Sequence, residues 1–349
     1  RECIGCNICI ASNGVGVPLR CTQNPTMGEE WRKSWHPEII PARASDDAVL
    51  VVGAGPAGLE AARALAQRGY QVHLAEAGTE LGGRVVREAR LPGLAEWIRV
   101  RDWRVQQLAK LTNVEIYRDS RLTAEQIREF GFPRVVIATG ARWRKDGVGR
   151  ANTRPVAGYD SPAVLTPDDV MAGARPEGPV VVFDDDGYYM GGVVAEALAL
   201  AGLPVTLVTT SGTVSPWTTA TLEQPYIQAR LLERGVRLIV SHSLSAVAPG
   251  EVELVDVYSK AVQRLEAASV VMVTARLPDD ALYHDLMAQP PLLEEAGIRT
   301  VQRIGDCLSP GIIAAAVYDG HRCAREFDAS ADDLSRADVP FRRERIAIG

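Results

Sequence analysis

The sequence predicts an α/β protein with two doubly wound domains that follow a short cysteine-rich lobe. Two apolar strand–turn–helix–strand patterns, one starting at Ala48 and one at Val180, predict one domain each. The chain of 349 residues is also longer than one ordinary hydrophobic core accommodates. Four of the six cysteines lie in the first 21 residues, which sets this segment apart from the rest.

The composition is typical of a globular protein and argues against two function classes. Apolar residues make up 46% of the chain and charged residues 23%, and no run approaches the roughly 18 apolar residues that span a bilayer. The net charge is −6 and the basic residues are scattered, so we expect neither a membrane nor a nucleic acid as partner. Sparse cysteines and the lack of a secretory signal predict a reducing, cytoplasmic location. The first residue is Arg, so we expect the N-terminus to be cut.

The first domain is assigned to residues 46–160 together with 280–349. Its predicted elements are strands over Ala48–Val52, Val72–Glu76 and Val135–Ala138, a returning segment over Arg303–Asp306, and helices over Leu59–Arg68 and Gly311–Glu326. A strand, a tight glycine turn, a helix and a second strand in this order make a βαβ unit.

The second domain is assigned to residues 161–279. Its predicted elements are strands over Val180–Phe183, Val205–Val208 and Ser269–Val273, and a helix over Val193–Ala201 that Gly202 ends. Residues 1–45 show neither the helical nor the strand period and are rich in Gly, Pro and Cys. They are therefore predicted to form a metal-binding lobe built from loops.

The spacing of the N-terminal cysteines favours an iron–sulfur cluster. Cys3, Cys6 and Cys9 form a C-x2-C-x2-C run, and Cys21 follows after eleven residues. Thiolates at this spacing can bind three corners of a cubane while a loop brings the fourth ligand. Zinc also accepts four thiolates, but structural zinc more often uses two separated C-x2-C pairs. The sequence therefore predicts a [4Fe–4S] cluster, with zinc and unliganded thiols as the alternatives.

The first glycine turn predicts an adenine-nucleotide site. It reads Gly53, Ala54, Gly55, Pro56, Ala57 and Gly58. The turn follows a predicted strand and opens a helix, and Glu76 ends the next strand about twenty residues on, as in Rossmann-like domains. Gly53 permits the tight turn, Gly55 lets a pyrophosphate approach, and Gly58 lets the helix pack on the strand. The helix N-terminus then faces the phosphates, and the Glu76 carboxylate accepts hydrogen bonds from the ribose hydroxyls.

The second glycine turn lacks these features. Three consecutive carboxylates, Asp184–Asp186, stand where a dinucleotide pyrophosphate would bind, and Tyr188 and Tyr189 are expected to fill space that its backbone contacts need. After the next strand, Thr209–Ser211 supplies neither the acidic residue typical of NAD sites nor an Arg for NADP. We therefore predict a second domain that has lost its nicotinamide site. A cation held by the three aspartates is the alternative.

Several stretches of the chain resemble the trimethylamine and dimethylamine dehydrogenases and their histamine dehydrogenase relatives. They are Cys3–Cys9, Cys21–Pro25, Gly28–Glu30, Trp35–Glu38, Leu91–Trp97, Ala138–Trp143, Gly187–Tyr188, Gly305–Asp306 and Phe341–Ala347. The resemblance covers essentially the whole chain. It implies an iron–sulfur flavoprotein related to the dienoyl-CoA reductases, in which an N-terminal TIM barrel carries covalent FMN and oxidises the amine.

The resemblance also implies partners and a division of labour. The cluster would pass single electrons from the FMN to an electron-transferring flavoprotein. The barrel is missing from this sequence and is expected in cis or in trans, so no catalytic residue is assigned. The intact enzyme is expected to be a homo-oligomer.

Further positions resemble the FAD-binding elements of the glutathione-reductase-like fold. They are Gly83, Arg84, Thr139, Gly140, Gly305 and Asp306. In the amine dehydrogenases the first domain holds ADP, whereas in the related reductases the same site holds FAD and the second domain takes NADPH. Because the second turn is broken here, the sequence favours ADP as a structural ligand over FAD.

Three functions from different classes follow. The leading hypothesis is the electron-transfer half of an amine dehydrogenase with a cluster and ADP. The second is an NAD(P)H-dependent ene-reductase module with FAD and a cluster. The third is a non-enzymatic module that binds an iron–sulfur cluster and a nucleotide, because a fold alone does not determine a function.

Overall fold

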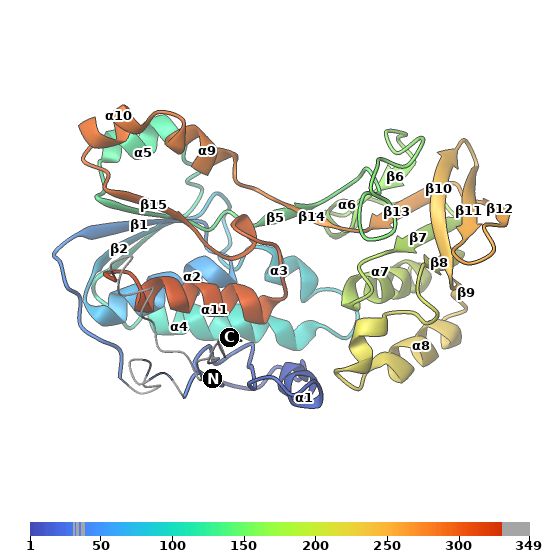
Figure 1. Cartoon of the computed structure of the whole chain (residues 1–349), viewed down its shortest axis with the longest axis horizontal. Coiled ribbons are helices and arrows are strands. Elements are labelled where there is room, and N and C mark those ends of the chain that lie inside the picture. Colours follow the sequence, from blue (N-terminus) through green and yellow to red (C-terminus); the bar gives the residue numbers. More distant parts are fainter. Residues whose placement is uncertain (31, 33–34, 36–38, 330–349) are drawn as a thin grey trace, which may run out of the picture.

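The computed structural model describes residues 1–30, 32, 35 and 39–329. Its first sheet is five-stranded and parallel. In spatial order its strands are β15 (Thr300–Arg303), β4 (Arg134–Ile137), β1 (Ala48–Val52), β2 (Gln71–Ala75) and β3 (Val114–Tyr117). The chain thus returns from its C-terminal part to complete this sheet (Figure 1).

A second parallel sheet of five strands lies apart from the first. In spatial order its strands are β6 (Val164–Leu165), β13 (Ser269–Val273), β7 (Val180–Asp184), β8 (Val205–Thr209) and β9 (Arg237–Ile239). An antiparallel sheet packs beside it, formed by β10 (His242–Ala248), β11 (Glu251–Asp256) and β12 (Val262–Glu266). A two-stranded ribbon of β5 (Ala141–Trp143) and β14 (Arg276–Pro278) connects the two halves.

Helices cover both faces of the first sheet (Figure 1). On one face lie α2 (Pro56–Arg68), α4 (Arg99–Leu108) and α11 (Ile313–Arg325), and on the other α5 (Ala124–Phe130), α9 (Ala281–Met287) and α10 (Pro290–Glu295). The remaining helices are α1 (Ile8–Gly14), α3 (Arg84–Glu88), α6 (Pro167–Met171), α7 (Tyr189–Leu200) and α8 (Gln224–Glu233), with 3₁₀ turns η1 (Ala95–Ile98), η2 (Pro216–Thr219) and η3 (Gly305–Cys307).

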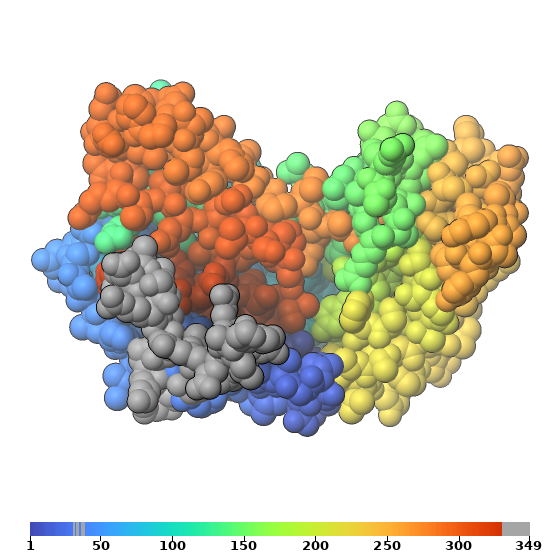
Figure 2. Space-filling view, in the orientation of Figure 1, coloured from blue at the N-terminus to red at the C-terminus, as the bar shows by residue number. Residues whose placement is uncertain are grey.

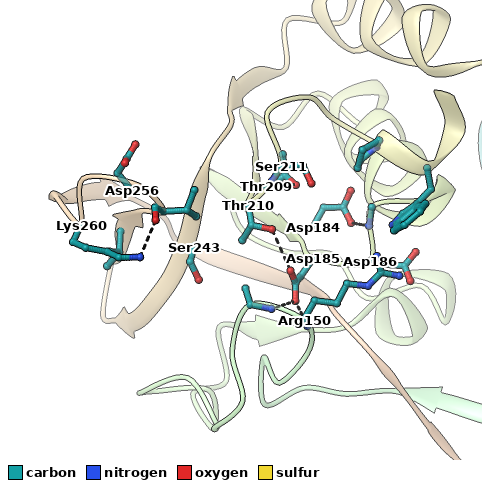
Figure 3. A pocket seen from close by; sticks show the side chains of 16 residues that line it. Arg150, Asp184, Asp185, Asp186, Thr209, Thr210, Ser211, Ser243, Asp256 and Lys260 are labelled. Atoms are coloured by element: carbon teal, nitrogen blue, oxygen red, sulfur yellow. Dashed lines mark hydrogen bonds between the residues drawn. The ribbon is translucent and has the colours of Figure 1, made fainter.

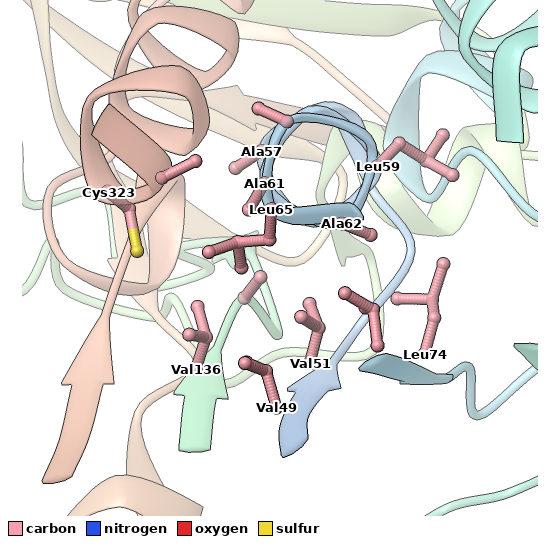
Figure 4. Packing of buried hydrophobic residues seen from close by; sticks show 14 of the residues in the cluster. Val49, Val51, Ala57, Leu59, Ala61, Ala62, Leu65, Leu74, Val136 and Cys323 are labelled. Atoms are coloured by element: carbon pink, nitrogen blue, oxygen red, sulfur yellow. The ribbon is translucent and has the colours of Figure 1, made fainter. Parts of the chain in front are cut away.

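The alternation of side chains along β1 builds two cores at once. Val49 and Val51 point to α2, whereas Leu50 and Val52 point to the opposite face with α5, α9 and α10. Figure 4 shows the first of these cores, in which small residues of α2, with Leu65, pack onto the sheet beside α11. Small side chains on α2 let the helix and the sheet approach closely. The glycine turn between β1 and α2 therefore lies at the carboxyl end of β1.

Most predicted elements are confirmed, but two helices begin earlier than expected. Strands β1 and β13 have the predicted bounds. Helix α2 starts at Pro56 rather than Leu59, because proline is well suited to the first helical position. Helix α7 starts at Tyr189 rather than Val193, so its first turn includes the residues that were expected to form the second nucleotide turn.

The N-terminal lobe contains a helix that the sequence did not predict. Helix α1 spans Ile8–Gly14, and Asn7 before it has a left-handed backbone (φ 52°). The Asn7 side-chain amide donates a 3.0 Å hydrogen bond to the carbonyl oxygen of Thr221, which lies between η2 and α8. In Figure 2 the lobe, in dark blue, lies against the yellow second half as well as below the first.

The segment from residue 146 to 158 belongs to the second half of the molecule, not to the first domain as predicted. Val156 packs in the core between the second sheet and the antiparallel sheet, and Ala157 forms a bridge to Ala246 of β10. The Asn152 amide donates to the carbonyl oxygen of Leu244 at 3.1 Å. Among the described residues, no helix is long and apolar enough to cross a membrane.

Candidate functional site

A cleft of about 1120 Å³ joins the first glycine turn to the N-terminal lobe. Ten of the twelve predicted nucleotide-site residues line it: Gly53, Gly55, Pro56, Ala57, Glu76, Gly83, Arg84, Thr139, Gly140 and Asp306. Gly58 and Gly305 do not line the cleft. The same cleft is lined by Cys6 and Thr22 of the lobe and by Tyr188 of the second half.

Glycine occurs at the three glycine positions of the turn for different structural reasons. A Cβ on Gly58 would lie 1.9 Å from the Gly53 carbonyl oxygen, so only glycine lets α2 approach the turn. Gly53 has φ +102°, and a Cβ there would lie 2.4 Å from the Ala138 carbonyl oxygen. Gly55 has an ordinary φ of −71° and open space where its Cβ would be. No protein contact requires glycine at residue 55, and a pyrophosphate against the backbone would fit this space.

Gly305 acts in packing behind the site. Its φ is +61°, and a Cβ would lie 2.5 Å from the Ala57 Cβ. Its N–H donates to the Asp319 carboxylate of α11 at 2.7 Å. The close approach of η3 to the start of α2 explains why glycine is needed at residue 305.

Glu76 connects the end of β2 to the glycine turn. One carboxylate oxygen accepts the N–H of Ala54 and the other accepts the N–H of Gly78, both at 2.8 Å. Each oxygen has a second lone pair, so the carboxylate can still accept a ribose hydroxyl from the cleft. The sequence predicted the ligand contact but not this bracing of the turn.

Arg84 begins α3 at the cleft wall and lies among charged groups. Its Nη2 donates to the Ala141 carbonyl oxygen at 2.6 Å, and burial lowers the pKa of the guanidinium. Burial likewise raises the pKa of the Glu88 carboxyl, against the opposing effect of Arg84 and Arg276. The cleft wall here therefore holds a cation and a carboxyl that are both poorly solvated.

Asp306 and Arg276 together hold the segment that leads into α11. The Asp306 carboxylate accepts the Gly311 N–H at 2.9 Å and forms a 2.6 Å ion pair with Arg276. Arg276 also donates to the Gly311 carbonyl oxygen. Thr139 lies nearby, with its hydroxyl 3.2 Å from the buried Cys307 Sγ. Cys307 and Cys323 are both buried.

Cys3, Cys6, Cys9 and Cys21 form no disulfide, so all four sulfurs are available as ligands, and their donor chemistry fits a cluster. Cys6 Sγ lies 3.1 Å from the Thr22 hydroxyl, and the Gly5 N–H donates to Cys3 Sγ at 3.3 Å. Burial is the largest cause of a raised pKa of the Cys6 thiol, and nearby Cys21 and Cys3 add to it. Throughout the described ranges, no three His, Cys, Asp or Glu side chains group around one metal ion. The predicted cluster site remains a prediction.

The pocket of the second half, about 430 Å³, contains the three consecutive aspartates (Figure 3). Asp185 accepts hydrogen bonds from the backbone N–H groups of Arg150 and Ala151 and from the Thr210 hydroxyl. The backbone N–H groups of Arg150 and Ala151 at this pocket are thus already paired with a carboxylate of the chain itself.

The charge of Asp184 differs from the prediction of three charged aspartates at this turn. It ends β7, is fully buried, and accepts the Gly187 N–H at 2.9 Å with one oxygen, while the other has no hydrogen-bond partner. Burial, with a smaller contribution from Asp186, raises its pKa to about 8. The side chain is therefore mostly uncharged at neutral pH, and the negative charge at this turn is smaller than the sequence suggested.

The two tyrosines also lie elsewhere than predicted. Tyr188 and Tyr189 line the large cleft rather than the pocket of the second half. The Tyr189 ring packs edge-on against Trp97, with centroids 5.3 Å apart, and its hydroxyl donates to Glu223. Burial, followed by the nearby Cys6, raises the pKa of the Tyr188 hydroxyl. The start of α7 thus places both tyrosines at the large cleft.

A buried charge network joins the lobe to α2, and no sequence pattern predicted it. Arg104 of α4 is fully buried and donates to Glu60 at 2.9 Å and to the Gln23 side chain at 3.0 Å. Glu60 also binds Arg63 and the Nδ1 of His321. Burial, the largest single contribution, raises the pKa of the Glu60 carboxyl, but Arg63, Arg104 and the hydrogen bond from His321 together hold this pKa well below its ordinary value. Gln23 follows Cys21 by two positions, so the network anchors the cysteine loop.

Comparison with known proteins confirms the predicted resemblance. Dimethylamine dehydrogenase of Hyphomicrobium sp. (strain x) is 40% identical over all of this chain and half of its own. The structure of histamine dehydrogenase from Rhizobium sp. 4-9 is 52% identical with a TM-score of 0.94, covering 99% of this chain and 53% of that chain. A 6-hydroxypseudooxynicotine amine oxidase from Pseudomonas geniculata N1 is 47% identical with a TM-score of 0.91, covering 94% and 49%.

The chain spans about half the length of the curated relatives it matches. The family model described as pyridine nucleotide-disulphide oxidoreductase matches residues 47–315, which hold both parallel sheets and the glycine turn. The paired sheets, the turn above β1 and this match agree, and the chain belongs to the pyridine nucleotide-disulphide oxidoreductase family.

Proposed function

We propose that this chain is the electron-transfer part of an amine dehydrogenase-like iron–sulfur flavoprotein. Cys3, Cys6, Cys9 and Cys21 would hold a [4Fe–4S] cluster, whose chemistry would be single-electron transfer between FMN on a separate TIM-barrel domain and an electron-transferring flavoprotein. The relatives support this proposal, because an amine dehydrogenase and an amine oxidase match nearly all of the chain.

The observation that carries the proposal is the shared cleft. The glycine turn and Glu76 line one part of it, and Cys6 lines another. The lobe is anchored to α2, the helix of the turn, through Arg104 and Glu60. The nucleotide and the lobe would therefore stabilise each other's position.

We propose ADP as the nucleotide, with a structural role. The α2 N-terminus would face the diphosphate, Gly55 would admit it, and Glu76 would accept a ribose hydroxyl. Family membership also fits FAD. ADP is preferred because of the second half, where a pyridine-nucleotide donor would bind. There Asp185 already accepts hydrogen bonds from the backbone N–H groups of Arg150 and Ala151.

The composition of the purified chain tests both parts. The chain is expressed anaerobically, its ligand is released by heat and identified by chromatography, and iron and sulfide are assayed on the same sample. We expect ADP without flavin and about four irons and four sulfides per chain, the content of one cubane. Zinc in place of iron, or the absence of any nucleotide, would contradict the proposal.

An NAD(P)H-dependent reductase module with FAD is the second candidate. An NADH oxidase of Thermoanaerobacter brockii is 31% identical over 340 residues, which cover 93% of this chain and 47% of that protein. FAD in the released ligand would favour this candidate.

A further inference from the structure

Cys6 has a different environment from the other three cysteines of the lobe. It is the one of the four that lines the large cleft, beside Ile4, Thr22 and Tyr188. If the lobe holds a cluster, Cys6 is therefore the cysteine ligand that also lines the cleft of the nucleotide turn. Groups that contact this sulfur are placed to influence the cluster.

The Thr22 hydroxyl is such a group. Its Oγ1 lies 3.1 Å from Cys6 Sγ, and Thr22 is 4% exposed, so little water competes for this contact. Either atom can donate while Cys6 is a thiol. A cysteine that binds metal is a thiolate and can only accept, so the hydroxyl must then be the donor.

The position of Thr22 is held through its neighbour Gln23. It lies between Cys21 and Gln23 in the chain, and Gln23 accepts hydrogen bonds from the buried Arg104 on both its side-chain and its backbone oxygen. The Gln23 amide also donates to the Arg99 carbonyl oxygen at 3.2 Å. The chain next to Thr22 is thus held in place by contacts that do not involve the four cysteines.

We propose that Thr22 is a positioning residue that raises the reduction potential of the cluster by donating a hydrogen bond to Cys6 Sγ. A reduced cluster carries more negative charge on its sulfurs than an oxidised one, and a donor at a sulfur stabilises that charge. This inference rests on the proposed function in one respect, namely that the four cysteines bind an iron–sulfur cluster.

The test compares substitutions that keep the shape but change the hydroxyl. Thr22→Val removes the donor with little change in volume, and Thr22→Ser restores it. Thr26→Val is the matched control, because Thr26 is equally buried at 4% but its hydroxyl donates to Asn24 at 3.0 Å rather than to sulfur. The midpoint potential of the cluster is measured by anaerobic titration followed by electron paramagnetic resonance, with iron counted per chain.

We expect Thr22→Val to shift the midpoint potential to a more negative value, while Thr22→Ser and Thr26→Val stay close to the parent. An unchanged potential in Thr22→Val, at the same iron content, would overturn the inference and leave the proposed function intact. A parent chain without iron and sulfide would overturn both. Should Thr22→Val lose iron, Thr22→Ala replaces it, and the same shift is required of it.

Discussion

Glu76 accepts the backbone N–H of Ala54 in the nucleotide turn with one carboxylate oxygen and that of Gly78 in the loop after β2 with the other. In Glu76→Gln one oxygen becomes an NH₂ group, so one of these donors loses its acceptor at a cost of about 1–3 kcal/mol. We expect ADP to bind roughly 10- to 100-fold more weakly, as measured by calorimetric titration of nucleotide-free protein. Glu115→Gln, on the exposed edge strand β3, is the control. Equal affinity in both variants would show that the carboxylate does not organise the turn.

Asp184 predicts a pH dependence of stability whose direction follows from its raised pKa. The folded pKa of about 8 exceeds the ordinary value of 3.8, so the stabilising contribution is complete below pH 3.8 and is lost as the pH rises toward 8. Asp184→Asn cannot ionise and keeps an acceptor for the Gly187 N–H. Between pH 5 and 8, we expect the unfolding free energy of the parent to fall relative to this variant by up to ~1.4 kcal/mol per pH unit.

Urea unfolding at several pH values checks this prediction. The exposed Asp46→Asn variant serves as the control, because its side chain is 91% exposed. Parallel pH profiles of the parent and Asp184→Asn would mean that the buried carboxyl does not take up a proton on folding.

Substitutions at two glycines of the β1–α2 turn test folding and ligand binding separately. Gly58→Ala places a methyl group 1.9 Å from a backbone oxygen that cannot move away without shifting the turn. We expect a loss of about 1–3 kcal/mol or more in unfolding free energy. Gly55→Ala places its methyl in open space at a φ that alanine adopts readily, so stability should stay the same or rise slightly.

The same methyl on Gly55 would occupy the space proposed for the pyrophosphate. We therefore expect Gly55→Ala to abolish ADP binding in a folded protein. Urea unfolding and ADP titration on both variants test this contrast. Normal ADP affinity in Gly55→Ala would place the nucleotide elsewhere.

The contact of α4 with α2 depends on the buried Arg104–Glu60 pair. Both side chains are fully buried, so Arg104→Met leaves the Glu60 carboxylate short of one cation and should cost about 3–5 kcal/mol. Glu60→Leu combined with Arg104→Met should cost less than the sum of the single changes. A double-mutant cycle by urea unfolding measures this coupling, and additivity within about 0.5 kcal/mol would show that the pair is not coupled.

At the scale of the whole molecule, electrons are proposed to enter the lobe and not the second half. Asp185 already binds the backbone donors of Arg150 and Ala151, and Asp186 lies beside it in the pocket. We expect anaerobic NADH or NADPH to leave the visible absorbance of the chain unchanged, whereas dithionite bleaches it. Bleaching by either pyridine nucleotide would support the reductase candidate instead.

How the two halves and the lobe are joined was only partly predictable from the sequence. Buried strands such as β1 and β13 show as continuous apolar runs, so their bounds were predicted correctly. The edge strand β3 was missed because its residues are mostly exposed and show no burial pattern. The contact of Arg104 with Gln23 joins residues 81 positions apart, and nothing local marks either of them.

The sequence by itself determined the α/β class, the glycine turn on a strand–helix unit and the spacing of four thiols. These features depend on local patterns of apolar, small and sulfur-containing residues, which act over a few positions. The tertiary structure decided that Cys6, Thr22 and Tyr188 meet the nucleotide turn in one cleft, that Asp184 is mostly uncharged, and that Tyr189 lines the same cleft. Those outcomes depend on burial and on contacts between distant segments, and burial changes both the direction a side chain faces and the charge it carries.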